Sequence, residues 1–132
     1  MNKYAYPAVF TPEENNLFSV HFPDLEGCYT SGEGLADAIE MAEDVLAFTL
    51  YDYEKKHSPI PEPSKSVYIK LEKDEFVNII ACNTLEYQKK NNNKAVKKTL
   101  SIPEWLNELA VAANINFSQL LQDALKEKLN LA

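Results

Sequence analysis

One long helix in the first half of the chain constrains the fold more than any other feature. Apolar side chains recur at helical spacing from Leu35 to Tyr53, and five acidic residues occupy the opposite side of the same segment. Lys55 and Lys56 follow at the C-terminal end, where cations interact favourably with the helix dipole. The pattern predicts an amphipathic helix of five turns that packs on a sheet and exposes an acidic face.

Segments rich in β-branched and aromatic residues lie on both sides of this helix and predict the strands of that sheet. A polar turn joins the first two segments into a hairpin, and Gly32 and Gly34 are expected to end the third. Three prolines in Ser58–Ser64 predict an extended crossover before the fourth. The expected strands are Lys3–Phe10, Leu17–Phe22, Cys28–Ser31 and Phe76–Ala81.

A second, much smaller unit follows a polar, lysine-rich segment. We expect a first domain over residues 1–85, a linker over 86–96 and a second domain over 97–132, so the fold class is α+β with two domains. The second domain is predicted as a short strand followed by two amphipathic helices. About 36 residues are too few to bury a core, so this domain is expected to form an interlocked dimer. The apolar residues expected to build it are Leu100, Ile102, Trp105, Leu106, Leu121 and Leu125.

Composition and charge narrow the classes of protein further. The 132 residues carry a net charge of −7, and all thirteen basic residues are lysine, so bidentate guanidinium contacts to guanine or phosphate are excluded. Residues 1–75 hold six lysines and fifteen acids, whereas residues 76–132 hold seven lysines and five acids. This asymmetry suggests two partners of different charge. No segment is apolar enough to span a membrane and no signal-peptide core opens the chain, and two isolated cysteines favour a reducing cytoplasm.

Residue types that support catalysis are present without the spacing that catalysis needs. The acids Asp24, Glu26, Glu40, Asp44 and Asp52 raise the possibility of a two-metal nuclease site. Asp44 and Asp52, however, are expected to face solvent, and the predicted strand interiors carry no carboxylate to meet them. No nucleophile–base pair and no phosphate-binding glycine loop occurs. We therefore expect no catalytic residue, no metal site and no cofactor.

Two blocks of sequence resemble a known family. The string Phe22-Pro23-Asp24-Leu25-Glu26-Gly27-Cys28, after Tyr6–Phe10 and before the helix entry at Gly32, is similar to the HicB antitoxin family. The run Lys98–Leu106, continued through Asn116-Phe117-Ser118, resembles a ribbon-helix-helix DNA-binding unit. The two blocks follow the family's order and together cover nearly the whole chain.

This resemblance implies an antitoxin of a type II toxin–antitoxin pair. Its N-terminal domain would have a partial ribonuclease-H-like fold and would bind and neutralise a HicA-type toxin that cleaves messenger RNA. Its C-terminal domain would form a homodimer, bind operator DNA and repress the operon, with a higher oligomer possible when toxin is bound. The candidate toxin contacts are the exposed acidic face of the long helix and the bend after the second strand, at Phe22, Asp24 and Glu26.

Family members carry either a ribbon-helix-helix or a helix-turn-helix at the C-terminus, and the residues favour the ribbon. Two paired strands would present short or basic side chains to the major groove, whereas the second helix offers an acid and no arginine. Free N–H groups at the start of that helix would bind phosphate. The residues expected to bind DNA are Lys97, Thr99, Ser101, Asn116 and Ser118.

Two alternatives remain open at this point. The chain could be a stand-alone transcriptional regulator whose N-terminal domain binds a small molecule or self-associates, and genome context would separate this from an antitoxin. It could also be an active nuclease of the ribonuclease-H type, which magnesium-dependent cleavage of RNA by the first domain would reveal.

Overall fold

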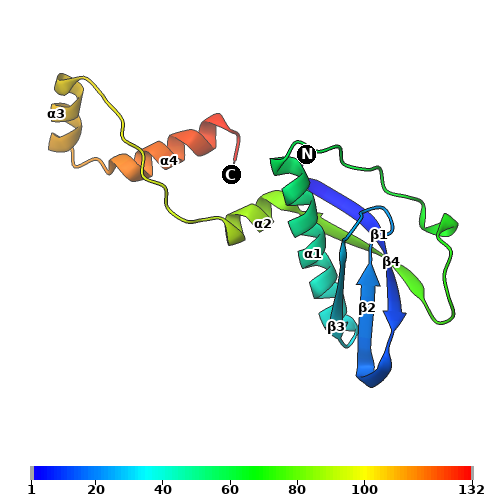
Figure 1. Cartoon of the computed structure of the whole chain (residues 1–132). Coiled ribbons are helices and arrows are strands. Elements are labelled where there is room, and N and C mark those ends of the chain that lie inside the picture. Colours follow the sequence, from blue (N-terminus) through cyan, green and yellow to red (C-terminus); the bar gives the residue numbers. More distant parts are fainter. Residues whose placement is uncertain (1, 132) are drawn as a thin grey trace. The chain divides into compact units, whose positions relative to one another are not determined.

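The computed structural model describes residues 2–131, which divide into two compact units, Met1–Lys94 and Ala95–Ala132. The first unit is built on a four-stranded antiparallel sheet of order β3-β2-β1-β4 (Figure 1). The turn between the first two strands contains a short 3-10 segment, Glu14–Asn16, in which Asn15 and Asn16 adopt positive φ angles that asparagine tolerates well. The strands are β1 (Lys3–Pro12), β2 (Leu17–His21), β3 (Tyr29–Glu33) and β4 (Phe76–Asn83).

The predicted long helix is confirmed as α1 (Leu35–Lys55), which lies across one face of the sheet (Figure 1). Two of its alanines, Ala38 and Ala42, are completely buried in the core, which brings the helix backbone close to the sheet. The hydrophobic core between the two layers consists of Tyr6, Ala8, Phe10, Val20, Phe22, Leu25, Cys28, Ala38, Ala42, Leu46, Leu50 and Ile80.

Gly32 does not end the third strand as the sequence suggested. β3 runs through it to Glu33, and a Cβ atom added at Gly32 would lie 2.4 Å from the backbone nitrogen of Ala38. Glycine stands here because the first turn of α1 passes directly over the strand. The extended backbone ends at Gly34, where φ is +86° and which directly precedes α1.

The crossover after α1 packs against the core through Ile60 and is held by hydrogen bonds at two points. The backbone carbonyl of Pro61 accepts a hydrogen bond from the Tyr6 hydroxyl, and both carboxylate oxygens of Asp24 accept hydrogen bonds from Ser64. A short 3-10 turn, η2 (Ser66–Tyr68), follows before β4. The proline-rich segment is therefore extended, as predicted, and it is also anchored.

The expected boundary at residue 85 falls inside a helix that the sequence analysis did not predict. This helix, α2 (Thr84–Asn91), follows β4 directly and belongs to the first compact unit, which extends to Lys94. The side-chain oxygen of Asn83 caps it by accepting hydrogen bonds from the backbone N–H groups of Leu85 and Glu86, at 2.9 and 3.1 Å. The segment expected to be a linker thus starts as an ordered, capped helix.

The second unit contains two helices, α3 (Glu104–Ala112) and α4 (Phe117–Lys128). Asn116 caps α4, because its side chain accepts a hydrogen bond from the backbone N–H of Gln119 at 3.0 Å. The strand predicted over 96–102 is not paired in the single chain, since a strand needs a neighbour and this unit supplies none among its described residues. None of the helices over residues 2–131 is both long enough and apolar enough to cross a membrane.

Candidate functional site

The residues expected to bind DNA lie on the surface of the second unit. Lys97, Thr99 and Ser101 are all exposed, and within the described chain their side chains make no hydrogen bond or ion pair. Ser118 is exposed in the first turn of α4, while the side chain of Asn116 is occupied as its cap. The side chains of Lys97, Thr99 and Ser101 are therefore accessible to another molecule. The side chain of Asn116 already caps α4.

The apolar side chains of the second unit are uncovered to a degree that is unusual for a folded unit. Trp105 is 63% exposed and Leu100 is 65% exposed, and no residue described in this unit is fully buried. A groove of about 560 Å³ opens between the segment before α3 and the face of α4. Its lining combines Leu100, Ile102, Phe117, Leu120 and Leu121 with a few polar groups. Such a surface needs a partner that buries it.

The bend proposed for partner contacts has a different role at two of its three positions. Phe22 is 2% exposed and belongs to the core, so the expectation that it contacts a partner directly is wrong. The carboxylate of Asp24 is occupied by Ser64, which it ties to the bend from 40 residues away. Glu26 alone is exposed. The bend contributes Phe22 to the hydrophobic core and binds the crossover through Asp24.

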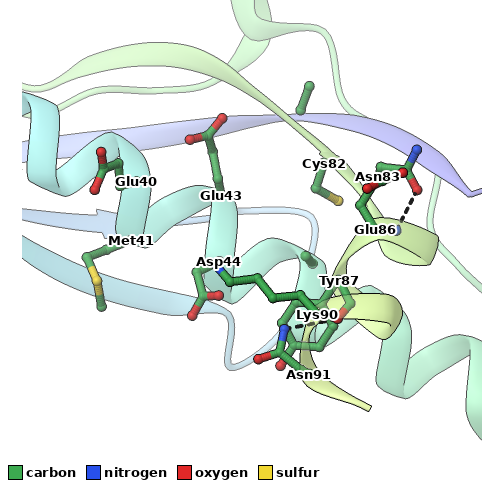
Figure 2. Close-up of a pocket in the computed structure, with 12 residues that line it drawn as sticks. Glu40, Met41, Glu43, Asp44, Cys82, Asn83, Glu86, Tyr87, Lys90 and Asn91 are labelled. Carbon is green, nitrogen blue, oxygen red and sulfur yellow. Dashed lines mark hydrogen bonds between the residues drawn. The ribbon is translucent and has the colours of Figure 1, made fainter. Parts of the chain in front are cut away.

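The acidic helix face that was expected to be exposed forms one wall of a groove between α1, the end of β4 and α2, and the sequence did not predict the groove itself (Figure 2). This surface, called here the acidic groove, has a volume of about 730 Å³. Its acidic side chains come from α1 at Glu40, Glu43 and Asp44 and from α2 at Glu86, and among the described residues that line it Lys90 is the only cation. Sequence held a signal for it, because Met41 lies among these acids and outside the apolar stripe of α1.

An aromatic cluster fixes α2 against α1 beside the acidic groove. The ring centroid of Tyr87 lies 6.4 Å from that of Phe48 and 5.8 Å from that of Tyr51. The Tyr51 hydroxyl accepts a hydrogen bond from the side-chain amide of Asn92 at 3.2 Å, and the Lys55 ammonium lies 5.3 Å from the Tyr51 ring centroid. Burial raises the pKa of Tyr87, and the negative charge of Asp44 acts in the same direction. The groove wall is therefore rigid.

Other groups with shifted pKa values lie where α1 packs against the sheet and α2 of the first unit. Glu54 accepts hydrogen bonds from the hydroxyls of Tyr4 at 2.7 Å and Thr84 at 3.0 Å, which joins α1 to β1 and to the first residue of α2. Burial, helped by Glu54, raises the pKa of Tyr4 to about 12. Burial likewise raises the pKa of the free thiol of Cys28 and that of Cys82, the latter to about 11, which makes both poor nucleophiles at neutral pH.

The described part of the chain contains no cluster of side chains suited to bind a metal ion. Among residues 2–131, no group of three or more His, Cys, Asp or Glu side chains could hold a metal ion. The carboxylates considered for a two-metal site are divided between the crossover anchor at Asp24 and the outer face of α1. What the molecule offers is one acidic groove in the first unit and one uncovered apolar surface in the second.

Known proteins that resemble this chain agree with the architecture. Residues 6–124 match the family described as HicB-like antitoxin of bacterial toxin–antitoxin system. Antitoxin HicB of Escherichia coli K12 is 36% identical over 63 residues, which are 46% of each protein. The chain thus spans about half the length of the curated relatives it matches.

Solved structures extend the likeness to both units. A chain of a toxin–antitoxin complex from Streptococcus pneumoniae is 29% identical, with a TM-score of 0.63 over 96% of this chain and 99% of that one. The antitoxin HicB of Burkholderia pseudomallei, at 16% identity, shares the fold with a TM-score of 0.53 over 96% of this chain and 98% of that one. Because the family match spans both compact units, the protein belongs to the HicB-like antitoxins of bacterial toxin–antitoxin systems.

Proposed function

We propose that this antitoxin binds and neutralises a HicA-type toxin through its first unit and represses its own operon through its second. The observation that carries the proposal is the family match over residues 6–124, which joins an acidic unit with its own core to a unit whose apolar faces are uncovered. The first unit is proposed to be a partial ribonuclease-H-like fold, and the four-stranded antiparallel sheet covered by α1 supports this. Its task is binding rather than catalysis, in the cytoplasm.

The second unit is proposed to be a ribbon-helix-helix dimer. In that arrangement, residues 97–101 of two copies pair as antiparallel strands, which would bury Leu100 and Ile102 against the helices of both chains. Lys97, Thr99 and Ser101 would then point into the major groove, where hydroxyls and ammonium groups contact base edges and phosphates. The exposure of all three side chains supports this assignment. The N–H groups at the start of α4, near Ser118, would bind the DNA backbone.

Toxin capture is tested by co-expression. The full chain, tagged, is produced together with the HicA-type protein encoded beside its gene. Recovery of the two proteins as one complex and restored growth of toxin-producing cells are expected. Absence of the complex would refute the antitoxin mechanism, and operator binding without toxin capture would favour a stand-alone regulator.

Operator binding is tested by fluorescence anisotropy with the DNA upstream of the gene and a scrambled duplex, each at two salt concentrations. The full chain is expected to bind its own DNA specifically and more weakly at the higher salt. Thr99→Ala with Ser101→Ala should reduce this affinity about tenfold or more, because each lost base contact costs ~1–3 kcal/mol. The matched control, Ser31→Ala with Ser66→Ala, removes two exposed hydroxyls from the first unit and should change nothing.

A further inference from the structure

The outer face of α1 is not built like an ordinary solvent-exposed helix face. Met41 and Phe48, seven residues apart and so on one side of the helix, are 40% and 57% exposed. Met41 lines the acidic groove together with Glu40 and Asp44, and Phe48 lies outside the groove, against the ring of Tyr87. Large apolar side chains exposed within a charged rim are typical of surfaces that receive a partner.

The charge of the acidic groove is not neutralised within the molecule. Within residues 2–131, the carboxylates of Glu40, Glu43, Asp44 and Glu86 accept no hydrogen bond and form no ion pair. Lys90 is the only cation that lines the groove, against these four acids. Glu40 and Asp44 are also spaced i,i+4, an arrangement of like charges that weakens a helix. An uncompensated acidic surface of this kind favours a cationic ligand.

The groove is preformed, so a ligand would not have to order it. The Asn83 cap fixes the start of α2, and the packing of Tyr87 on Phe48 and Tyr51 holds the helix against α1. Figure 2 labels Glu43 on α1, Cys82 on β4 and Tyr87 on α2, all of which line the groove. Three separate elements therefore present one continuous surface, which reduces the entropic cost of binding.

The same observations exclude several occupants. Nucleic acid is repelled by the groove's net negative charge. A bound metal ion is disfavoured because these carboxylates do not converge as a set of ligands in the described structure. The first unit of a second copy is disfavoured too, because that unit carries sixteen acids and nine lysines. A basic protein segment with an apolar side chain at its centre matches both the charge and the exposed Met41.

We infer that the acidic groove is the docking surface for a positively charged protein segment, whose lysines or arginines meet Glu40, Glu43 and Asp44 while an apolar side chain packs on Met41. The inference rests on the proposed function, in which this segment belongs to the toxin. It replaces the bend around Glu26 as the place where the toxin is held.

The test measures the affinity of the full-length chain for the HicA-type protein encoded beside its gene, by isothermal titration calorimetry at two salt concentrations. Glu40→Lys with Glu43→Lys should weaken binding about tenfold or more and reduce its salt dependence, because two attractive contacts become repulsive. Met41→Ala should weaken binding without changing the salt dependence, and it leaves the Phe48–Tyr87 contact that holds α2 against α1 in place. Glu13→Lys with Glu14→Lys is the matched control, two exposed acids reversed in the β1–β2 turn, and should bind like the parent.

The outcomes separate this inference from the proposed function. A parent chain that does not bind the toxin refutes the proposed function itself. A parent chain that binds, with both groove variants unchanged, overturns the groove while leaving the antitoxin intact, and a loss confined to Glu26→Lys would return the site to the bend. A salt-sensitive self-association that the lysine variants abolish in the absence of toxin would identify a second copy as the occupant, which also overturns the inference. Unaltered circular dichroism confirms that the variants, all at exposed positions, remain folded.

Discussion

Gly32→Ala tests the packing of α1 on the sheet at its tightest point. The new Cβ atom would lie 2.4 Å and 2.5 Å from the backbone nitrogen and Cα of Ala38, and 2.8 Å from the carbonyl carbon of Asp37. These are main-chain atoms in the first turn of α1 and cannot rotate away as a flexible side chain could. Overpacking a core costs ~1–3 kcal/mol, and a collision with backbone places this variant at the upper end, about 3 kcal/mol.

The assay is urea and thermal unfolding of the full chain, both followed by far-UV circular dichroism, to which α1 is the largest contributor in the first unit. For a unit of roughly 100 residues, about 3 kcal/mol corresponds to a fall in Tm of roughly 12–24 °C. Gly27→Ala is the control, because Gly27 has a φ of +73° with no atom within 4 Å of an added Cβ, so only the backbone cost of about 1 kcal/mol applies. Equal losses for the two variants would refute the steric argument.

Three further predictions concern assembly and the frame of the first unit. Leu106→Asp should abolish self-association, seen as a monomer mass by light scattering, while the first unit keeps its stability, because Leu106 is 41% exposed in the single chain. Glu54→Ala should destabilise the first unit by about 1–3 kcal/mol in urea unfolding, since the hydroxyls of Tyr4 and Thr84 both lose their acceptor. Between pH 10 and pH 12 the folded state holds the Tyr4 proton more tightly than the unfolded state, so stability should fall as pH rises, and Tyr4→Phe should flatten this slope.

The spacing of apolar residues along the sequence predicted the long helix and the strands of the sheet. The helix expected over 35–53 and four strands are present within a few residues of their expected ends, because apolar periodicity records which side each residue buries. Gly32 was misjudged because its reason is a close approach to Ala38, a contact between elements. The helix α2 was missed because its lysine- and asparagine-rich sequence has no apolar stripe and depends on the Asn83 cap and the docking of Tyr87.

The candidate site was harder to predict, because exposure depends on the whole fold. The bend at Phe22–Gly27 drew attention through its distinctive string of residues, yet Phe22 is core and Asp24 is bound to the crossover. The acidic face of α1 was expected to be exposed, but the groove it helps to form was not, because α2, which supplies the opposite wall, was not predicted. The ribbon over 97–101 stays a prediction, since the partner strand it requires belongs to another copy.

The two units differ in whether they bury their own apolar side chains, and this difference affects how their stability depends on protein concentration. The first unit buries its own core, with Phe10, Leu46 and Leu50 fully enclosed, so its stability does not depend on concentration. The second unit exposes its large apolar residues, including Trp105 and Leu109 at 63% each, so in the proposed dimer its stability would come from association and would fall on dilution. On this account, dilution removes the assembled DNA-binding form before it affects the first unit. Toxin capture would then persist at antitoxin concentrations too low for repression.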